Sequence, residues 1–137
     1  MNILVMLMDE IERQAELHNV DSIDILIQLN ISGEESKFGI NPNELDGIFR
    51  YSDGLKRIKI RGLMTVLPKC CDSVTKKLFF NNINSIFVDN KSKTYHNVSM
   101  EYLSMGMSGD FCEAIECGSN IVRIGSRIFG ERDYSLK

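Results

Sequence analysis

The stretch LSMGMSGDFCEAIECGSNIVRIGSRIFG, residues Leu103–Gly130, contains two short apolar strands, and each of them runs into small residues. The first strand runs into the glycines and serine of residues 106–109, and the second runs into Gly125 and Ser126. A short helical segment lies between them. When strands are parallel, their carboxyl ends open onto one face, where loop N–H groups and hydroxyls can bind a phosphate. The stretch therefore predicts a parallel α/β fold with a phosphate site at the strand ends.

The same alternation of helix and strand continues upstream. Helices are expected over residues 3–17, 74–88 and 110–117, and a further helix is expected to open at residues 41–44. The second helix has a clear start, because Asn41 can act as N-cap, Pro42 suits the first turn and Glu44 can complete a capping box. Strands are expected over Asp24–Ile31, Ile58–Val66, Val98–Met105 and Ile121–Ile124. This order predicts a sheet of about four parallel strands with crossover helices.

Apolar spacing also predicts which side of each helix is buried. The stripe expected for the first helix is Leu4, Leu7, Met8, Ile11 and Ala15. The second helix is expected to bury Leu45, Ile48 and Phe49. The stripe expected for the third is Val74, Leu78, Phe79, Ile83, Ile86 and Phe87. In the last helix Asp110 and Glu113 are expected to form a capping pair, and Gly118 to end the helix.

Length and composition describe an ordinary globular domain. The chain has 137 residues, 43% hydrophobic and 26% charged, with a net charge of −3. A complete β/α barrel needs about 250 residues, so we expect a single domain over residues 1–137 that is less than a closed barrel. No basic block occurs, which argues against a nucleic-acid partner. The apolar run Ile3–Met8 is far shorter than the ~20 residues that span a bilayer, so no membrane partner is expected.

Cysteines and histidines give no metal or catalytic pattern. The cysteines are Cys70, Cys71, Cys112 and Cys117. Adjacent cysteines rarely bridge each other, and two cysteines five apart on one helix do not share a face, so we expect free thiols and a cytoplasmic location. No C-x-x-C motif and no paired histidines occur, so no metal site is predicted. His18 and His96 are far apart and outside any motif, and no catalytic residue is predicted.

Four motifs occur in order along the chain. They are DILIQLNISGEESKFGI at 24–40, IRGLMTV at 60–66, LSMGMSGD at 103–110 and VRIGSRIFGERDY at 122–134. On these motifs the chain resembles the pyridoxal-phosphate homeostasis proteins, which are similar to the N-terminal barrel of alanine racemases. The resemblance covers nearly the whole chain. It implies a (β/α)8 TIM-type barrel that binds pyridoxal 5'-phosphate (PLP) without established catalytic turnover.

One departure from the resemblance matters for function. Such proteins hold the cofactor as a Schiff base on a lysine of an early strand, in a motif of the form A-V-S-K, and this motif does not occur here. Their G-E-N-Y segment is missing as well. We therefore interpret the chain as the C-terminal half of a (β/α)8 barrel that lacks its N-terminal strands.

The resemblance assigns cofactor contacts to four residues, and the chemistry of methionine adds Met107 as a fifth candidate. Ser108, Gly125 and Ser126 would contact the phosphate, Arg123 would donate to the pyridine nitrogen, and Met107 could lie against the ring. Simpler interpretations stay open for each of them. Ser108 could cap the following helix, Gly125 and Ser126 could form a tight turn, and Arg123 could belong to a structural ion pair. Met107 lies among loop-forming residues, which leaves its role undecided.

Three functions are consistent with these patterns. The first is a non-catalytic PLP-binding protein of intracellular PLP homeostasis. The second is a PLP-dependent enzyme of the racemase type, which would need a further acid/base group. The third is a half-barrel scaffold that binds phosphate generically. The outer strands Asp24–Ile31 and Ile121–Ile124 would leave free sheet edges, so a homodimer through those edges is also expected.

Overall fold

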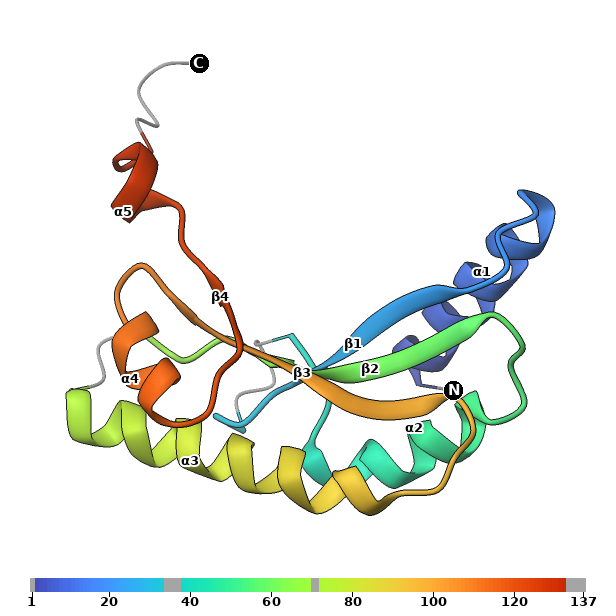
Figure 1. Ribbon diagram of the computed structural model, residues 1–137, viewed down its shortest axis with the longest axis horizontal. Coiled ribbons are helices and arrows are strands. Elements are labelled where there is room, and N and C mark those ends of the chain that lie inside the picture. Colours follow the sequence, from blue (N-terminus) through green and yellow to red (C-terminus); the bar gives the residue numbers. More distant parts are fainter. Residues whose placement is uncertain (1, 34–37, 70–71, 133–137) are drawn as a thin grey trace.

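A computed structural model describes residues 2–33, 38–69 and 72–132, and Figure 1 shows their arrangement. Its strands are β1 (Ile23–Leu29), β2 (Ile58–Thr65), β3 (Val98–Met107) and β4 (Ile121–Arg123). The α-helices are α1 (Ile3–Leu17), α2 (Leu45–Ser52), α3 (Ser73–Asp89), α4 (Phe111–Glu116) and α5 (Ser126–Phe129). Two short 3-10 helices, η1 (Pro42–Glu44) and η2 (Asn90–Ser92), complete the elements.

The four strands form one sheet in the order β1-β2-β3-β4, and every neighbouring pair is parallel. The predicted α/β sheet of four parallel strands is therefore confirmed. A crossover helix joins each consecutive pair: α2 joins β1 to β2, α3 joins β2 to β3, and α4 joins β3 to β4. Each connection returns the chain to the same end of the sheet, so the carboxyl ends of all four strands lie together at one end of the sheet.

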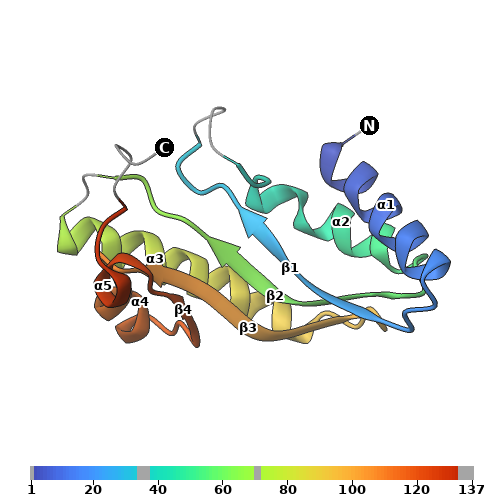
Figure 2. The same cartoon turned by 90° about the horizontal axis from the view of Figure 1, so that it is seen from above.

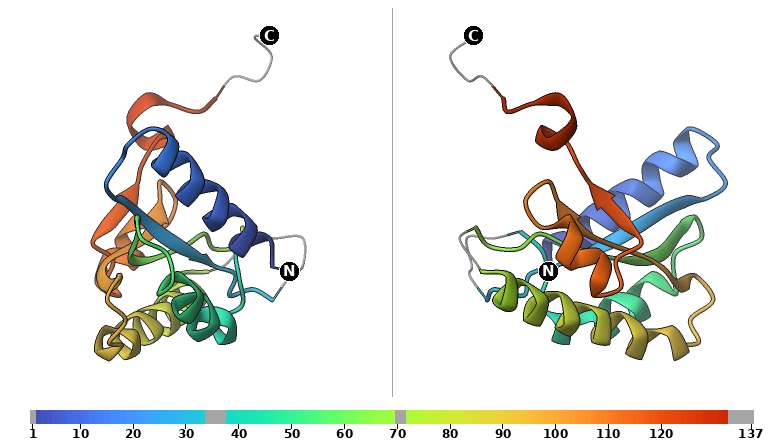
Figure 3. Two further views of the ribbon diagram at one scale, coloured as in Figure 1. Left: turned by 90° about the vertical axis from the view of Figure 1, so that its right-hand side faces the viewer. Right: turned by 60° about the vertical axis from the view of Figure 1, so that its left-hand side comes forward.

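One hydrophobic core lies between the sheet and the helices α1 to α4, whose positions Figures 2 and 3 show from different sides. Its fully buried members include Met8 of α1, Phe49 of α2, Ile60 of β2, Phe80 of α3 and Leu103 of β3. Side chains that alternate with the core residues along the strands project from the other face of the sheet. That second face carries charged and polar groups.

Local sequence signals set several element ends as predicted. Asn41 accepts a hydrogen bond from the Asn43 N–H, and the Glu44 carboxylate accepts one from the Asn41 N–H at 2.8 Å, so the capping box forms around Pro42. The predicted buried residues of α2 are all buried. Gly118 ends α4 with a φ of +105°, which a residue with a side chain rarely adopts.

The predicted buried side of α3 is wrong in part. Val74 and Leu78 are 71% and 66% exposed, whereas Phe80, Ile83 and Phe87 are buried. Successive residues of an α-helix are rotated by about 100°, so residues 74 and 78 lie on the side opposite Ile83. The prediction followed the density of apolar residues rather than one helical face. Similarly, Leu7 of α1 is half-exposed, while Met8 and Ala15 are buried.

Two further expectations around the last helices are corrected. Asp110 stands at the N-cap of α4 but makes no side-chain bond to the helix, because its carboxylate accepts from the Met107 N–H at 2.6 Å. Glu113 accepts instead from the hydroxyl of Ser73 on α3. The helix α5 was not expected, since four residues are too few to show a period. Cys70 and Cys71 lie outside the described residues, and Cys112 and Cys117 are free thiols.

Candidate phosphate and cofactor site

A depression of about 790 Å³ opens at the carboxyl ends of β3 and β4. It is lined by Lys69, Met107, Ser108, Gly109, Arg123, Gly125, Ser126, Phe129, Gly130, Glu131 and Arg132. All five residues that the sequence assigns to a cofactor site lie in this one lining. The topology accounts for this, because consecutive parallel strands deliver their loops to the same end of the sheet.

The end of β3 and the loop after it are held in shape by Gly106 and Asp110. Gly106 has a φ of +106°, and a Cβ there would lie 2.7 Å from the Cβ of Ala114, so only glycine lets α4 pack this closely. The Asp110 carboxylate then accepts from the Met107 N–H. Together these constraints turn the chain sharply after β3 and present Met107 and Ser108 to the depression.

Ser108 links the two loops of the site. Its hydroxyl oxygen accepts hydrogen bonds from the N–H groups of Gly125 and Arg127, each at 3.2 Å. This hydroxyl therefore makes no cap on α4, and one of the two interpretations left open by the sequence is excluded. The N–H groups of Gly125 and Arg127 converge on a single oxygen atom. Such convergent amides are also the donors that a phosphate oxygen would use.

Arg123 projects from β4 across the open face of the sheet. Its Nη2 donates to the carbonyl oxygen of Thr65 at 2.6 Å, and its Nη1 lies 3.4 Å from the Sδ atom of Met64. Its Nε is buried and has no hydrogen-bond partner within residues 2–33, 38–69 and 72–132. None of the carboxylates in those ranges forms an ion pair with Arg123, so the structural ion pair is not found there. Burial lowers the pKa of this guanidinium, and the nearby Asp110 partly opposes that shift.

The other lining residues complete the charge and the shape of the site. Met107 is half-exposed at the rim, and Ser126 begins α5 directly after Gly125. Sequence reasoning missed Lys69 and Arg132, two cations that a phosphate would attract, and Phe129, an exposed ring. Arg132 belongs to the quoted motif VRIGSRIFGERDY, so the motif could have identified it as a site residue. Lys69 follows β2 in a loop of ordinary composition, and no sequence pattern marks it as a site residue.

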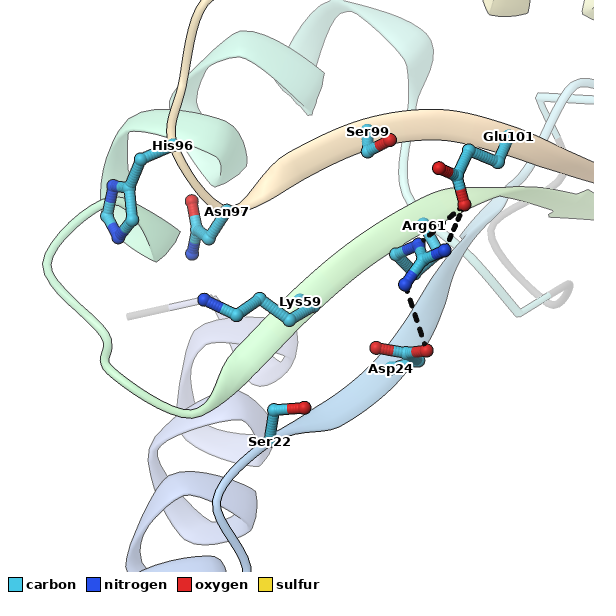
Figure 4. A pocket seen from close by; sticks show the side chains of 8 residues that line it. All are labelled: Ser22, Asp24, Lys59, Arg61, His96, Asn97, Ser99 and Glu101. Atoms are coloured by element: carbon cyan, nitrogen blue, oxygen red, sulfur yellow. Dashed lines mark hydrogen bonds and ion pairs between the residues drawn. The ribbon is translucent and has the colours of Figure 1, made fainter.

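A second depression of about 400 Å³ lies at the opposite, amino end of the strands and is shown in Figure 4. At its centre Arg61 of β2 pairs with Asp24 of β1 at 3.2 Å and with Glu101 of β3. The hydrogen bond from Arg61 lowers the pKa of the Glu101 carboxyl. Lys59 lies in the same lining, so two acids face two bases; the cluster ties three strands together and leaves little net charge for a ligand.

No three His, Cys, Asp or Glu side chains come together as possible metal ligands in the described ranges. In those ranges there is also no helix of the length and apolarity that a membrane crossing requires.

Comparison with known proteins places the chain in a family. Residues 3–133 match the alanine racemase N-terminal domain family, and the chain belongs to that family. A pyridoxal phosphate homeostasis protein of Aquifex aeolicus is 41% identical over 128 residues, which are 93% of this chain and 55% of that protein. The Escherichia coli protein of the same name is 40% identical over 126 residues, which are 92% of this chain and 51% of that one. The chain thus spans about half the length of the curated relatives it matches.

Solved structures share the fold. The PipY protein of Synechococcus elongatus, with PLP bound, superposes with a TM-score of 0.80 at 23% identity, covering 91% of this chain and 57% of that one. Alanine racemase from Corynebacterium glutamicum gives a TM-score of 0.56 at 16% identity, covering 85% of this chain and 32% of that one. The α/β architecture with four parallel strands is therefore similar to the alanine racemase N-terminal domain, as the resemblance implied.

Proposed function

We propose that this chain binds PLP at the carboxyl ends of β3 and β4 and acts in intracellular PLP homeostasis without catalysing a reaction. The relatives named for that role support the proposal, as does the solved PipY structure with PLP bound. The proposal includes the fold as the C-terminal half of a (β/α)8 barrel, with residues 1–137 as one domain. It also includes a cytoplasmic location, which the free thiols of Cys112 and Cys117 support.

One observation carries the proposal, namely the buried Nε of Arg123, which has no partner among the residues that the structure describes. A buried donor without a partner costs free energy, and such donors in native proteins have a reason. This donor lies in the depression that also holds Ser108, Gly125 and Ser126. PLP presents an acceptor, its pyridine nitrogen, at a ring position separate from the carbon that bears its phosphate arm. The residues present therefore fit the group: Arg123 at the ring nitrogen, and Ser108, Gly125 and Ser126 at the phosphate.

The same arrangement supports binding rather than turnover. When bound, PLP supplies an electron sink whose strength depends on a proton at the ring nitrogen. An arginine is effectively always charged and can only donate, so Arg123 would keep that nitrogen unprotonated and weaken the sink. Among the described residues that line the depression there is no tyrosine or histidine to act as a second acid/base group. Met107 and Phe129 would instead shield the ring.

The test is a titration of the wild-type chain with PLP, followed by absorbance and by calorimetry, beside inorganic phosphate and pyridoxal. Gly125→Val is the decisive variant, because its φ of −121° suits any residue and a Cβ there meets nothing within 4 Å. The variant should fold normally yet lose PLP and phosphate together, since the side chain occupies the approach to the amides. Gly47→Val, on α2 and with open space around its Cβ, is the matched control. A wild-type chain that gives no heat with any of the three compounds overturns the proposal.

A further inference from the structure

The sheet has two free edges. In the part of the chain that the structure describes, β1 pairs on one side with β2, and its outer side meets only an isolated bridge between Leu29 and Ile40. At the other end β4 pairs with β3 alone. Each edge therefore presents backbone N–H and C=O groups that a further strand could satisfy.

Apolar side chains gather beside both edges. A groove of about 500 Å³ runs from α1 past β1 to Met64 of β2, and its lining includes Ile3 and Leu7 of α1, Leu26 of β1 and Phe38. Ile3 is 82% exposed. Beyond β4, the short helix α5 stands away from the rest of the molecule in Figure 3. Its Ile128 is 67% exposed and its Phe129 85% exposed.

The segments that form the two edges differ in the sign of their total charge. The segment Ile3–Leu29, which forms α1 and β1, holds six acidic residues and one arginine. The segment 121–132, which forms β4 and α5, holds three arginines and one glutamate. Two β1 edges brought together would therefore repel each other, and so would two β4 edges. A β1 edge facing a β4 edge is the arrangement that the charges favour.

We propose that a second copy of this chain closes the sheet, with β1 of each protomer pairing in parallel with β4 of the other. A two-fold axis that runs along the strands keeps all strands pointing the same way, so both new contacts are parallel like the three within the chain. Two sheets of four strands then close into one barrel of eight strands, the number at which side chains just fill the interior of a barrel. In this dimer α5 of one protomer lies beside the α1–β1 groove of the other.

The arrangement also gives the free face of the sheet a partner. The two acids and two bases that line the depression of Figure 4 balance each other on that face, so two copies can face each other there without accumulating charge of one sign. The proposed dimer depends on the two sheet edges and does not require PLP binding. Its test measures mass, which separates its failure from a failure of the proposed function.

The experiment uses the whole chain and two variants, one at each edge. Sedimentation equilibrium of the wild type at micromolar concentration should give twice the chain mass of 15.6 kDa. Ile3→Asp alters the β1 side and Ile128→Asp the β4 side, and both positions are exposed in the monomer. Each variant alone should raise the dimer Kd at least about a hundredfold, because the substituted charge is buried twice per dimer. Leu78→Asp, an exposed leucine on α3, is the matched control and should remain dimeric.

Mixing the two variants tests whether β1 of one protomer pairs with β4 of the other or whether like edges pair. A mixed dimer keeps one unaltered contact, between β1 of the Ile128→Asp chain and β4 of the Ile3→Asp chain, so mixing should restore part of the association. Circular dichroism confirms that each variant is folded. If only one of the two variants dissociates, the contact joins like edges and the proposal is wrong. A monomeric wild type, or species that keep growing with concentration instead of closing at two, overturns it as well.

Discussion

Replacing Arg123 by leucine should separate PLP from inorganic phosphate. The guanidinium makes its two contacts through Nη1 and Nη2, to Met64 and to the Thr65 carbonyl, and leaves Nε without a partner among the described residues. In the proposed site this Nε meets the ring nitrogen, while the phosphate is held by Ser108, Gly125 and Ser126. Removing the guanidinium therefore removes a ring contact and leaves the phosphate contacts in place.

The size of the effect follows from one hydrogen bond to a charged group. Such a bond contributes about 1.5–3 kcal/mol. Since about 1.4 kcal/mol is tenfold in an equilibrium constant, Arg123→Leu should weaken PLP binding by about tenfold to about 150-fold. Stability should change little, because leucine gives up the bond to Thr65 but also removes a buried donor that has no partner. The two effects oppose each other and are each about 1 kcal/mol.

Isothermal calorimetry with PLP, pyridoxal and phosphate measures this directly, beside a thermal melt of each protein. Arg127→Leu is the matched control, because it makes the same change of charge on α5, and the Arg127 contact to the Ser108 hydroxyl comes from its backbone N–H. The control should bind all three compounds within about threefold of the wild type. Equal losses of PLP and phosphate in Arg123→Leu, with an unchanged melt, would show that Arg123 does not face the ring, and would refute the reasoning.

Two substitutions and one labelling experiment test the fold and the missing lysine motif. Gly62→Ala should prevent soluble expression or lower the urea midpoint sharply, because a Cβ there would lie 1.7 Å from the Tyr102 carbonyl oxygen on β3. Glu12→Gln should lower the free energy of unfolding by about 1.5–3 kcal/mol in a urea titration, because its carboxylate accepts from three backbone N–H groups, from Lys56 to Ile58. Borohydride reduction with PLP, followed by peptide mapping, should label no single lysine stoichiometrically; one lysine labelled in full despite competing free lysine would contradict this.

Much of the fold could be predicted because its signals are local. The capping box at Asn41 and Glu44 needs only four adjacent residues, and the glycine that ends α4 needs only its own φ. The order of strands and helices follows from apolar runs separated by loops. Parallel strands then have to deliver their loops to one end, which is why residues from two separate motifs line one depression.

The errors have different physical causes, and one of them is long-range packing. The buried side of α3 depends on which residues meet β2 and β3, and the run of apolar residues from Val74 to Phe87 offers more than one stripe. The direction of Asp110 depends on the turn at Gly106, which places the Met107 N–H within its reach before any helix amide. The helix α5 is too short to have a period.

Arg123 shows how far sequence reasoning could go at the site itself. An arginine inside the apolar segment Ile121–Ile124 predicted either an ion pair or a ligand contact, because a buried charge needs one of the two. The structure supplies a carbonyl partner from Thr65, 58 positions earlier, which no local pattern could identify. It supplies no carboxylate among the described residues and leaves one donor unused. A half-buried guanidinium whose buried Nε lacks a partner costs free energy, and an acceptor that reaches this donor removes the cost. At the open end of a parallel sheet, beside convergent amides, an acceptor on a bound anion meets that need better than the packing of this chain does.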